Sequence, residues 1–243
     1  MSYFGSYSPL VLIAMLVVVA SVYGFIELTD DVREGDTSHF DEWAIAWMHE
    51  HQGPRWLQIM GRDVTALGGV IVLAGMTLAV AGYFVLVRQY HVIVLLLIAT
   101  AGGAALNTGL KHLIGRERPP EEGRAVAEIS KSFPSGHAML SAAVYLTLGV
   151  LLARMTKSRK VKFYFLSLAL LITVMVGVSR VYLRVHWPTD VLAGWVIGLA
   201  WAILLWLIAT FLQRHGIIEQ GGRDVDDQPV DEQQPDRATV TLR

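Results

Sequence analysis

The feature that most constrains this chain is a series of long apolar stretches separated by short polar ones. Six such stretches of about 17–25 residues each occur, and a helix needs roughly 20 apolar residues to cross the hydrocarbon core of a bilayer. The hydrophobic fraction of 53% also exceeds that of soluble domains, which is about 45–50% even when glycine is counted. The sequence therefore predicts an integral membrane protein, an all-α bundle of six transmembrane helices.

The six predicted spans cover residues 8–28, 64–87, 91–110, 137–153, 163–181 and 188–212. The third contains Gly102 and Gly103, small residues that let helices approach closely in a membrane, and Asn107, whose amide needs a hydrogen-bond partner there. The last opens at Pro188, a favourable first helical residue. The first has no basic leader and no small-residue cleavage site after it, so we interpret it as a retained helix.

The segment after the first span is amphipathic and too short to cross the membrane. Its acidic residues Asp41, Glu42 and Glu50 lie off the apolar face. The apolar residues, which recur at helical spacing, are Phe40, Trp43, Ala44, Trp47 and Met48. Gly53-Pro54 ends this piece, and a second one follows at residues 56–60. Two interpretations stay open, namely short helices in the membrane interface or a cap packed on the helix ends.

Composition divides the chain and excludes several functions. Residues 1–218 form the predicted six-span domain, whereas residues 219–243 are rich in Asp, Glu, Gln and Pro and predict a disordered, solvent-facing tail. The absence of cysteine excludes disulfides and thiol chemistry. The formal net charge of −1 argues against a nucleic-acid binder.

Basic residues gather in two of the gaps between spans, where charges are expensive and therefore indicate function. They are Lys111, Arg116, Arg118, Arg124 and Lys131 before the fourth span, and Arg180 and Arg184 before the sixth. Two spans separate these gaps, so both lie on the same side of the membrane. Guanidinium groups bind phosphate oxygens in pairs and a lysine adds a point charge. The pattern indicates a phosphate site.

The stretch Lys131 to His137 supplies a third wall of this site. Pro134-Ser135-Gly136 predicts a tight turn, and the apolar run from Ala138 predicts a helix. Gly136 and His137 then lie at a helix N-terminus, where backbone N–H groups and the helix dipole favour an anion.

Two histidines complete the chemistry of a phosphoryl transfer. His186 and Asp190 are four residues apart, so the carboxylate can accept a hydrogen bond from one ring nitrogen and leave the other free to attack. His137, from the opposite wall, can protonate the leaving oxygen.

The full pattern is Lys111-x6-Arg118-Pro119, then Pro134-Ser135-Gly136-His137, then Ser179-Arg180-x5-His186-x3-Asp190. It resembles the three-part signature of the type-2 phosphatidic acid phosphatase superfamily, which is shared with the vanadium haloperoxidases. The resemblance implies that His186 is the phosphoryl-accepting nucleophile, Asp190 orients it, and His137 is the general acid. It also implies no cofactor and no metal, and the sequence has no cluster with metal-ligand spacing. The phosphate-binding residues that it implies are Lys111, Arg118, Ser135, Gly136 and Arg180.

The expected function is therefore that of a membrane lipid phosphatase acting through a phosphohistidine intermediate. Its substrate would be a phospholipid or polyprenyl phosphate: phosphatidic acid, phosphatidylglycerol phosphate, undecaprenyl pyrophosphate or lipid A. One alternative is a phosphotransferase with an acceptor lipid. Another is a lipid-binding or transport protein, although no repeat halves or paired broken helices are evident. A haloperoxidase would require vanadate, and the membrane spans argue against it.

Residues outside the signature receive plainer interpretations. Arg116, Arg124 and Arg184 are candidate contacts for a lipid headgroup. The remaining histidines are interpreted as interfacial or surface residues; they are His39, His49, His51, His91, His112 and His215.

Loop charges predict the orientation of the chain, because Lys and Arg in short loops favour the cytoplasm. Those not explained by phosphate binding are Arg88, Arg154, Lys157, Arg159, Lys160, Lys162 and Arg214. We therefore expect a protein of the cytoplasmic membrane with both termini in the cytoplasm. Its active site would face the periplasm or the cell exterior.

Overall fold

The computed structural model describes residues 9–120 and 130–215. Within these ranges every regular element is a helix. The helices are α1 (Pro9–Glu34), α2 (Ser38–Glu50), α3 (Arg55–Ala66), α4 (Val70–Leu86), α5 (Tyr90–Leu97), a π-helical turn (Ile98–Gly102), α6 (Gly103–Ile114), α7 (Gly136–Arg154), α8 (Arg159–Tyr182) and α9 (Pro188–Arg214). The tail predicted at 219–243, and Arg124, lie outside the described residues.

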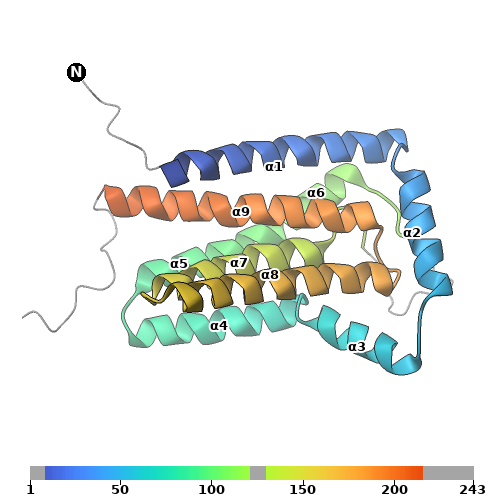
Figure 1. Ribbon diagram of the computed structural model, residues 1–243. Helices are drawn as coiled ribbons and strands as arrows, with labels where there is room; N and C mark the ends of the chain where they lie inside the picture. The colour runs from blue at the N-terminus through green and yellow to red at the C-terminus, as the bar shows by residue number, and fades with distance from the viewer. Residues whose placement is uncertain (1–8, 121–129, 216–243) are drawn as a thin grey trace, which may run out of the picture.

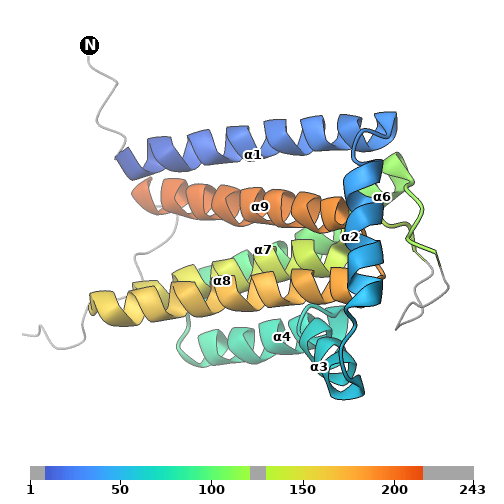
Figure 2. The ribbon, with the colours of Figure 1, turned by 45° about the vertical axis from the view of Figure 1, so that its right-hand side comes forward.

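The long helices run side by side, and α2 crosses one end of the bundle (Figures 1 and 2). In the described part of the chain, five helical stretches are long and apolar enough to cross a membrane: α1, α5 to α6 taken together, α7, α8 and α9. The pair α3 and α4, bent by 47°, makes a sixth if the two helices form one broken span. The predicted all-α membrane bundle is therefore confirmed, with five to six candidate spans.

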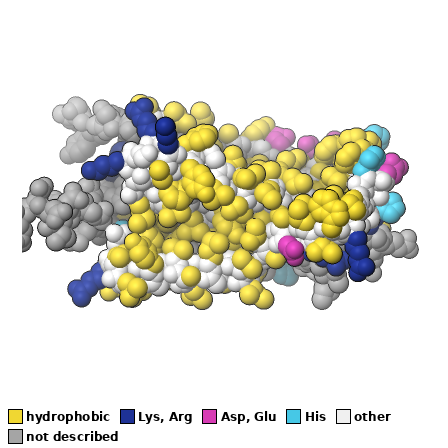
Figure 3. All heavy atoms as spheres, turned by 60° about the horizontal axis from the view of Figure 1, so that its bottom comes forward, with side chains coloured by type: hydrophobic (Ala, Val, Ile, Leu, Met, Phe, Trp, Pro, Cys, Tyr) yellow, Lys and Arg dark blue, Asp and Glu magenta, His cyan; other side chains and the backbone are white. Residues whose placement is uncertain are grey.

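The surface agrees with a bilayer environment. Apolar side chains cover the side of the bundle seen in Figure 3, whereas charged residues gather at its two ends. Leu16, Ile71 and Phe163 are each more than two-thirds exposed, which suits contact with lipid rather than water.

The second predicted span, residues 64–87, is divided between two helices. Residues 64–66 belong to α3, and the chain turns at Leu67, Gly68 and Gly69 before α4 begins. The hydroxyl of Tyr145 donates to the carbonyl of Leu67 over 2.8 Å and so satisfies a backbone group that the break leaves open. A Cβ at Gly68 would lie 2.4 Å from Cγ1 of Val176, so only glycine lets this corner pack so closely on α8.

Two other predicted boundaries also differ. Helix α1 continues through the acidic residues Asp30 and Asp31 to Glu34, beyond the end of the predicted span at residue 28. The short piece predicted at 56–60 is part of the twelve-residue helix α3. Polar and acidic residues end a membrane span, but they do not end a helix that continues into water.

Close glycine contacts hold the central helix α7 against its neighbours. A Cβ at Gly194 of α9 would lie 2.7 Å from the carbonyl oxygen of Ser135, and one at Gly198 would lie 2.4 Å from that of Met139. The indole of Trp201 in α9 donates to the carbonyl of Ala99, in the π-helical turn of the third span, over 3.3 Å. The same ring packs on Gly102 of that turn. The small residues thus allow the close approach expected of them.

Helix α2 presents two different faces. Phe40, Trp43 and Trp47 are 47%, 59% and 46% exposed, and they point away from the bundle. Ile45 and Met48 instead pack on the cluster formed by Ala138, Val181 and Val191. Asp41, expected only to lie off the apolar face, is buried with 1% exposure. The outward face is therefore suited to a membrane interface, and the inward face caps the bundle.

Candidate active site

A cavity of about 190 Å³ lies where the three signature segments meet. Five of the predicted site residues line it: Lys111, Arg118, Gly136, His137 and His186. Asn107 and Thr108 of α6 and Ser130 line it as well. The other three predicted residues, Ser135, Arg180 and Asp190, have exposures of 0%, 1% and 0%. Each of the eight therefore either lines the cavity or is almost fully buried.

His186 lies between a cation and a carboxylate. Its Nε2 is 3.1 Å from Nη1 of Arg118, and its Nδ1 is 3.2 Å from Oδ2 of Asp190. A guanidinium can only donate hydrogen bonds, so Nε2 must accept. The hydrogen-bond network therefore assigns the proton to Nδ1, which donates to Asp190. Nε2 therefore carries the electron pair that can attack a substrate, and His186 lines the cavity.

The carboxylate of Asp190 has donors on both oxygens. Oδ2 accepts from the backbone N–H of Trp187 over 2.9 Å and from the hydroxyl of Ser132, in addition to His186. Oδ1 accepts from Nη1 of Arg116 over 2.7 Å. A carboxylate buried to this degree is stable only when such partners compensate for its lost hydration.

Arg118 is held by main-chain acceptors. Its Nη1 donates to the carbonyl of Val185 over 2.6 Å and its Nε to that of Ser130 over 2.7 Å. Lys111, at the last turn of α6, donates to the carbonyl of Lys131. These contacts bring two fixed positive charges to one cavity.

The N-terminus of α7 forms the opposite wall. Ser135 is the N-cap residue; its hydroxyl accepts from the N–H of Ala138 over 3.5 Å, and its own N–H donates to the carbonyl of Asp190 over 2.9 Å. A Cβ at Gly136 would lie 2.9 Å from Oδ1 of Asn107. Asn107, whose partner could not be predicted, donates to the sulfur of Met139 over 3.6 Å.

Arg180 also makes a contact outside the signature. Its Nη1 donates to the hydroxyl of Thr65 in α3 over 3.0 Å. Because Thr65 lies near the end of α3, this contact ties the corner between α3 and α4 to the signature.

Arg116 was interpreted as a headgroup contact, and the structure gives it another set of partners. Its guanidinium binds Asp41 of α2 and Asp190, each over 2.7 Å, and lies 5.4 Å from the ring centre of Trp187. Sequence reasoning missed Asp41, and it also missed Ser132 and Thr189. The only signal was the proximity of Arg116 and Ser132 to signature residues, because Asp41 is far away in the chain.

Arg184 lies in a neighbouring cavity of about 570 Å³ with His49 and Trp187. Burial lowers the pKa of the Arg184 guanidinium, but this group keeps its charge at neutral pH. It contacts Nδ1 of His49, which must then accept. A headgroup contact at Arg184 remains a prediction.

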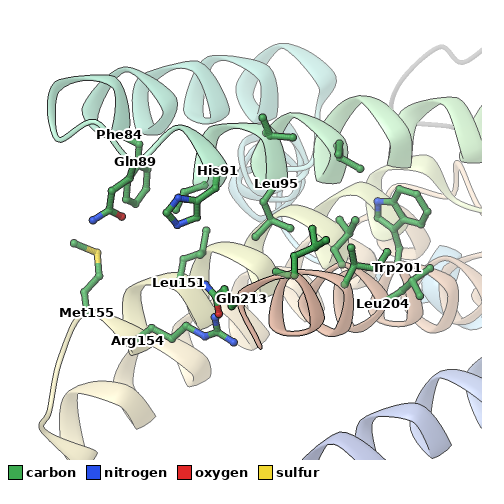
Figure 4. A pocket seen from close by; sticks show the side chains of 17 residues that line it. Phe84, Gln89, His91, Leu95, Leu151, Arg154, Met155, Trp201, Leu204 and Gln213 are labelled. Atoms are coloured by element: carbon green, nitrogen blue, oxygen red, sulfur yellow. The ribbon is translucent and has the colours of Figure 1, made fainter. Parts of the chain in front are cut away.

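Two further cavities, of about 560 and 510 Å³, have mainly apolar walls. Figure 4 shows the first, with Gln89, His91, Arg154 and Gln213 among its lining residues. His91, expected at the surface, is thus partly buried in a cavity wall. Among the described residues, neither cavity includes a member of the signature.

Comparison with known proteins agrees with this geometry. Residues 91–214 match the sequence profile of the PAP2 superfamily. Phosphatidylglycerophosphatase B of Bacillus subtilis is 34% identical over 160 residues, which cover 64% of this chain and 75% of that protein. The undecaprenyl-diphosphatase of Sulfolobus acidocaldarius is 37% identical over 67 residues, 28% of each chain.

A solved structure has the same fold. It is a crystal structure of a transmembrane PAP2-type phosphatidylglycerolphosphate phosphatase from Bacillus subtilis, with 31% sequence identity. The superposition covers 81% of this chain and 98% of that one, with a TM-score of 0.76. With the family match spanning α5 to α9 and five residues of the signature lining one cavity, the chain belongs to the PAP2 superfamily and is a multi-pass membrane lipid phosphatase.

Proposed function

We propose that this phosphatase works through a phosphohistidine at Nε2 of His186. The observation that carries the proposal is the position of His186, with Nδ1–H directed to Asp190 and Nε2 accepting from Arg118 at the cavity. Nε2 attacks phosphorus, so the N–P bond forms as the P–O bond to the lipid breaks. Asp190 stabilises the positive imidazole ring that results.

His137 supplies the proton for the leaving oxygen. It lines the same cavity as His186 and lies at the start of α7, whereas His186 lies in the connection between α8 and α9, so the two rings can act on opposite sides of one phosphorus atom. In the second half-reaction His137 takes a proton from water as the water attacks phosphorus. The N–P bond then breaks and inorganic phosphate leaves.

The charge that develops on phosphate oxygens requires donors that are already in position. Lys111 and Arg118 supply fixed cations, and Gly136 supplies a backbone N–H at the N-terminus of α7. We assign Ser135 and Arg180 to the same anion as its buried donors. With these groups the reaction proceeds without a cofactor or a metal.

The substrate that we propose first is phosphatidylglycerol phosphate. The relative that matches over 160 residues and the solved structure are both phosphatases named for that lipid. Undecaprenyl pyrophosphate is second, because the match to the archaeal undecaprenyl-diphosphatase is confined to 67 residues. Phosphatidic acid and lipid A also carry a phosphoryl group, and they are the remaining two candidate substrates.

The site faces the periplasm or the cell exterior, and both termini are cytoplasmic. Lys157, Arg159 and Lys160 lie in or beside the short connection between α7 and α8, at the other end of these helices from His137 and Arg180. Basic short loops favour the cytoplasm. The substrate would then be a lipid of the outer leaflet of the cytoplasmic membrane.

The test is release of inorganic phosphate by purified protein from each of the four lipids, with His186→Ala as the blank. We expect release with water as the only acceptor, fastest with phosphatidylglycerol phosphate. Release that requires an added acceptor lipid would identify a phosphotransferase instead. Lipid binding without turnover in the unmodified protein would identify a binding protein.

A further inference from the structure

Asp41 of α2 is a buried carboxylate with a complete set of partners. Its Oδ2 accepts from Nη2 of Arg116 over 2.7 Å and from the hydroxyl of Thr189 over 2.6 Å. Its Oδ1 accepts from the N–H of Thr189 over 3.1 Å. Its exposure is 1%, so the carboxylate depends on these contacts rather than on water.

Arg116 divides its guanidinium between two carboxylates. Nη2 binds Asp41, whereas Nη1 binds Oδ1 of Asp190 over 2.7 Å and the hydroxyl of Thr189 over 2.8 Å. The side chain is only 16% exposed, and Trp187 covers it from one side. The planar fork of an arginine can bridge two acids in this way, but the single ammonium of a lysine cannot keep both contacts in the same geometry.

The arrangement fixes the plane of the Asp190 carboxylate. Arg116 holds Oδ1, and the hydroxyl of Ser132 and the N–H of Trp187 hold Oδ2 at the nitrogen of His186. Without Arg116, the buried carboxylate would lose its cation and one of the contacts that set its orientation. The proton on Nδ1 of His186, and hence the electron pair on Nε2, depends on that orientation.

We propose that Asp41 and Arg116 are a positioning pair for the dyad of His186 and Asp190. Neither is among the residues that line the cavity, so the pair acts through Asp190 rather than on the substrate. The interfacial helix α2 thereby contributes to an active site whose other residues come from the later helices. The inference rests on the proposed function, because it takes His186 as the nucleophile and Asp190 as its orienting group.

The competing explanation is that the pair only fastens α2 to the bundle. The two explanations differ in what they predict for folded protein. A fastening role affects the thermal unfolding temperature and leaves the turnover of each folded molecule unchanged. A positioning role lowers kcat and leaves KM nearly constant, because the cavity that binds the phosphoryl group is intact.

The experiment measures kcat, KM and thermal unfolding in detergent with a short-chain phosphatidylglycerol phosphate. We expect Arg116→Gln to lower kcat by roughly 100-fold and Asp41→Asn by roughly 10-fold, the range for groups that orient catalytic ligands. Arg116→Lys should fall between Arg116→Gln and the unmodified protein. Glu50→Gln, an exposed acid at the end of the same helix, is the matched control and should match the unmodified protein.

A double variant tests whether Asp41 acts through Arg116. Residues in one network give non-additive effects. Asp41→Asn combined with Arg116→Gln should therefore be no slower than Arg116→Gln alone, because it also removes the unpaired buried acid. Independent, multiplying effects on kcat would overturn the coupling. If Arg116→Gln does not fold, Asp41→Asn and Arg116→Lys carry the same comparison.

The outcomes separate this inference from the proposed function. Unchanged kcat in the folded variants, together with an inactive His186→Ala, would overturn the positioning pair alone. Full turnover by His186→Ala would overturn the proposed mechanism and the positioning pair with it.

Discussion

Nη1 of Arg118 donates to Nε2 of His186 over 3.1 Å, so the arginine that we propose to bind phosphate also holds the electron pair of the proposed nucleophile. A phosphoryl group offers Arg118 charged acceptors that are stronger than a neutral imidazole nitrogen. In the proposed mechanism, binding of the substrate would draw the guanidinium toward the phosphate oxygens and free Nε2 to attack. Recognition of the phosphate and release of the nucleophile would then be one event.

Loss of the nucleophile should abolish turnover, whereas loss of its partner should not. His186→Ala removes the atom that forms the covalent bond, so neither phosphate release nor acid-labile labelling of the protein is expected. Asp190→Asn should keep a small residue of activity, since loss of an orienting carboxylate costs about 10⁴-fold. The measurement uses a radiolabelled lipid phosphate. Label on His186→Ala at the level of the unmodified protein would exclude His186 as the phosphoryl acceptor.

Arg118→Lys tests the double role of that arginine. A lysine keeps the charge but loses the planar fork that reaches His186 and two main-chain carbonyls together. We expect kcat/KM to fall about 10²–10³-fold, as when one preorganised donor to a developing anion is lost. Steady-state kinetics of Arg118→Lys and the unmodified protein give the comparison. A decrease in kcat/KM of less than threefold would show that the guanidinium of Arg118 does not stabilise the transition state.

The reaction should not depend on a divalent cation. Lys111, Arg118 and Arg180 supply the positive charge proposed for the phosphate, so activity should persist in excess chelator. Vanadate should inhibit, because its trigonal bipyramidal form resembles the transferring group. Phosphate release with and without each reagent is the measurement. Complete loss in chelator with recovery on addition of magnesium would contradict the proposed site.

Gly68 should be far less tolerant of a side chain than Gly75 of α4. A Cβ at Gly68 would lie 2.4 Å from Cγ1 of Val176 and 3.2 Å from Cβ of His137, whereas one at Gly75 meets nothing within 4 Å. We expect Gly68→Ala to lower the free energy of unfolding by about 1–3 kcal/mol through overpacking and to reduce turnover. Gly75→Ala should be neutral or stabilising by up to about 1 kcal/mol. The measurements are thermal unfolding and steady-state kinetics of both variants. Equal unfolding temperatures and equal turnover of Gly68→Ala and Gly75→Ala would show that the corner does not constrain His137.

The orientation can be tested by cysteine labelling, because the chain has no native cysteine. Glu50→Cys puts a thiol on α2, at the active-site end of the bundle, and Ser158→Cys puts one just before α8, in the basic loop. A membrane-impermeant maleimide should label Glu50→Cys in intact cells and should label Ser158→Cys only after lysis. The reverse pattern would turn the active site to the cytoplasm.

The sequence alone predicted the helical bundle and five of the residues that line the cavity, for a simple reason. Span length is a local property, and the count of spans between two gaps decides which side each gap occupies. His186 and Asp190 needed only a spacing of four residues to make contact. Such features can be predicted from the sequence because they depend on few long-range contacts.

Other features depend on packing that no local pattern encodes. Asp41 and Glu42 look equivalent as acids on an amphipathic helix, and only the docking of α2 on the bundle buries the first. Arg116 could equally have served a headgroup until its two carboxylate partners were known. The break at Gly68 lies inside an apolar run, where glycine is also common in unbroken membrane helices.

The small size of the active-site cavity has a consequence for how the products part. A volume of about 190 Å³ lies below the roughly 300–1,000 Å³ of pockets that enclose drug-sized molecules, so at the proposed site it would hold the phosphoryl end and leave the lipid chains outside. Once the ester bond breaks, the lipid alcohol already lies in the bilayer and diffuses away within the plane. Inorganic phosphate alone has to leave the protein, and it leaves into water. The two products therefore separate into different phases, which opposes the reverse reaction.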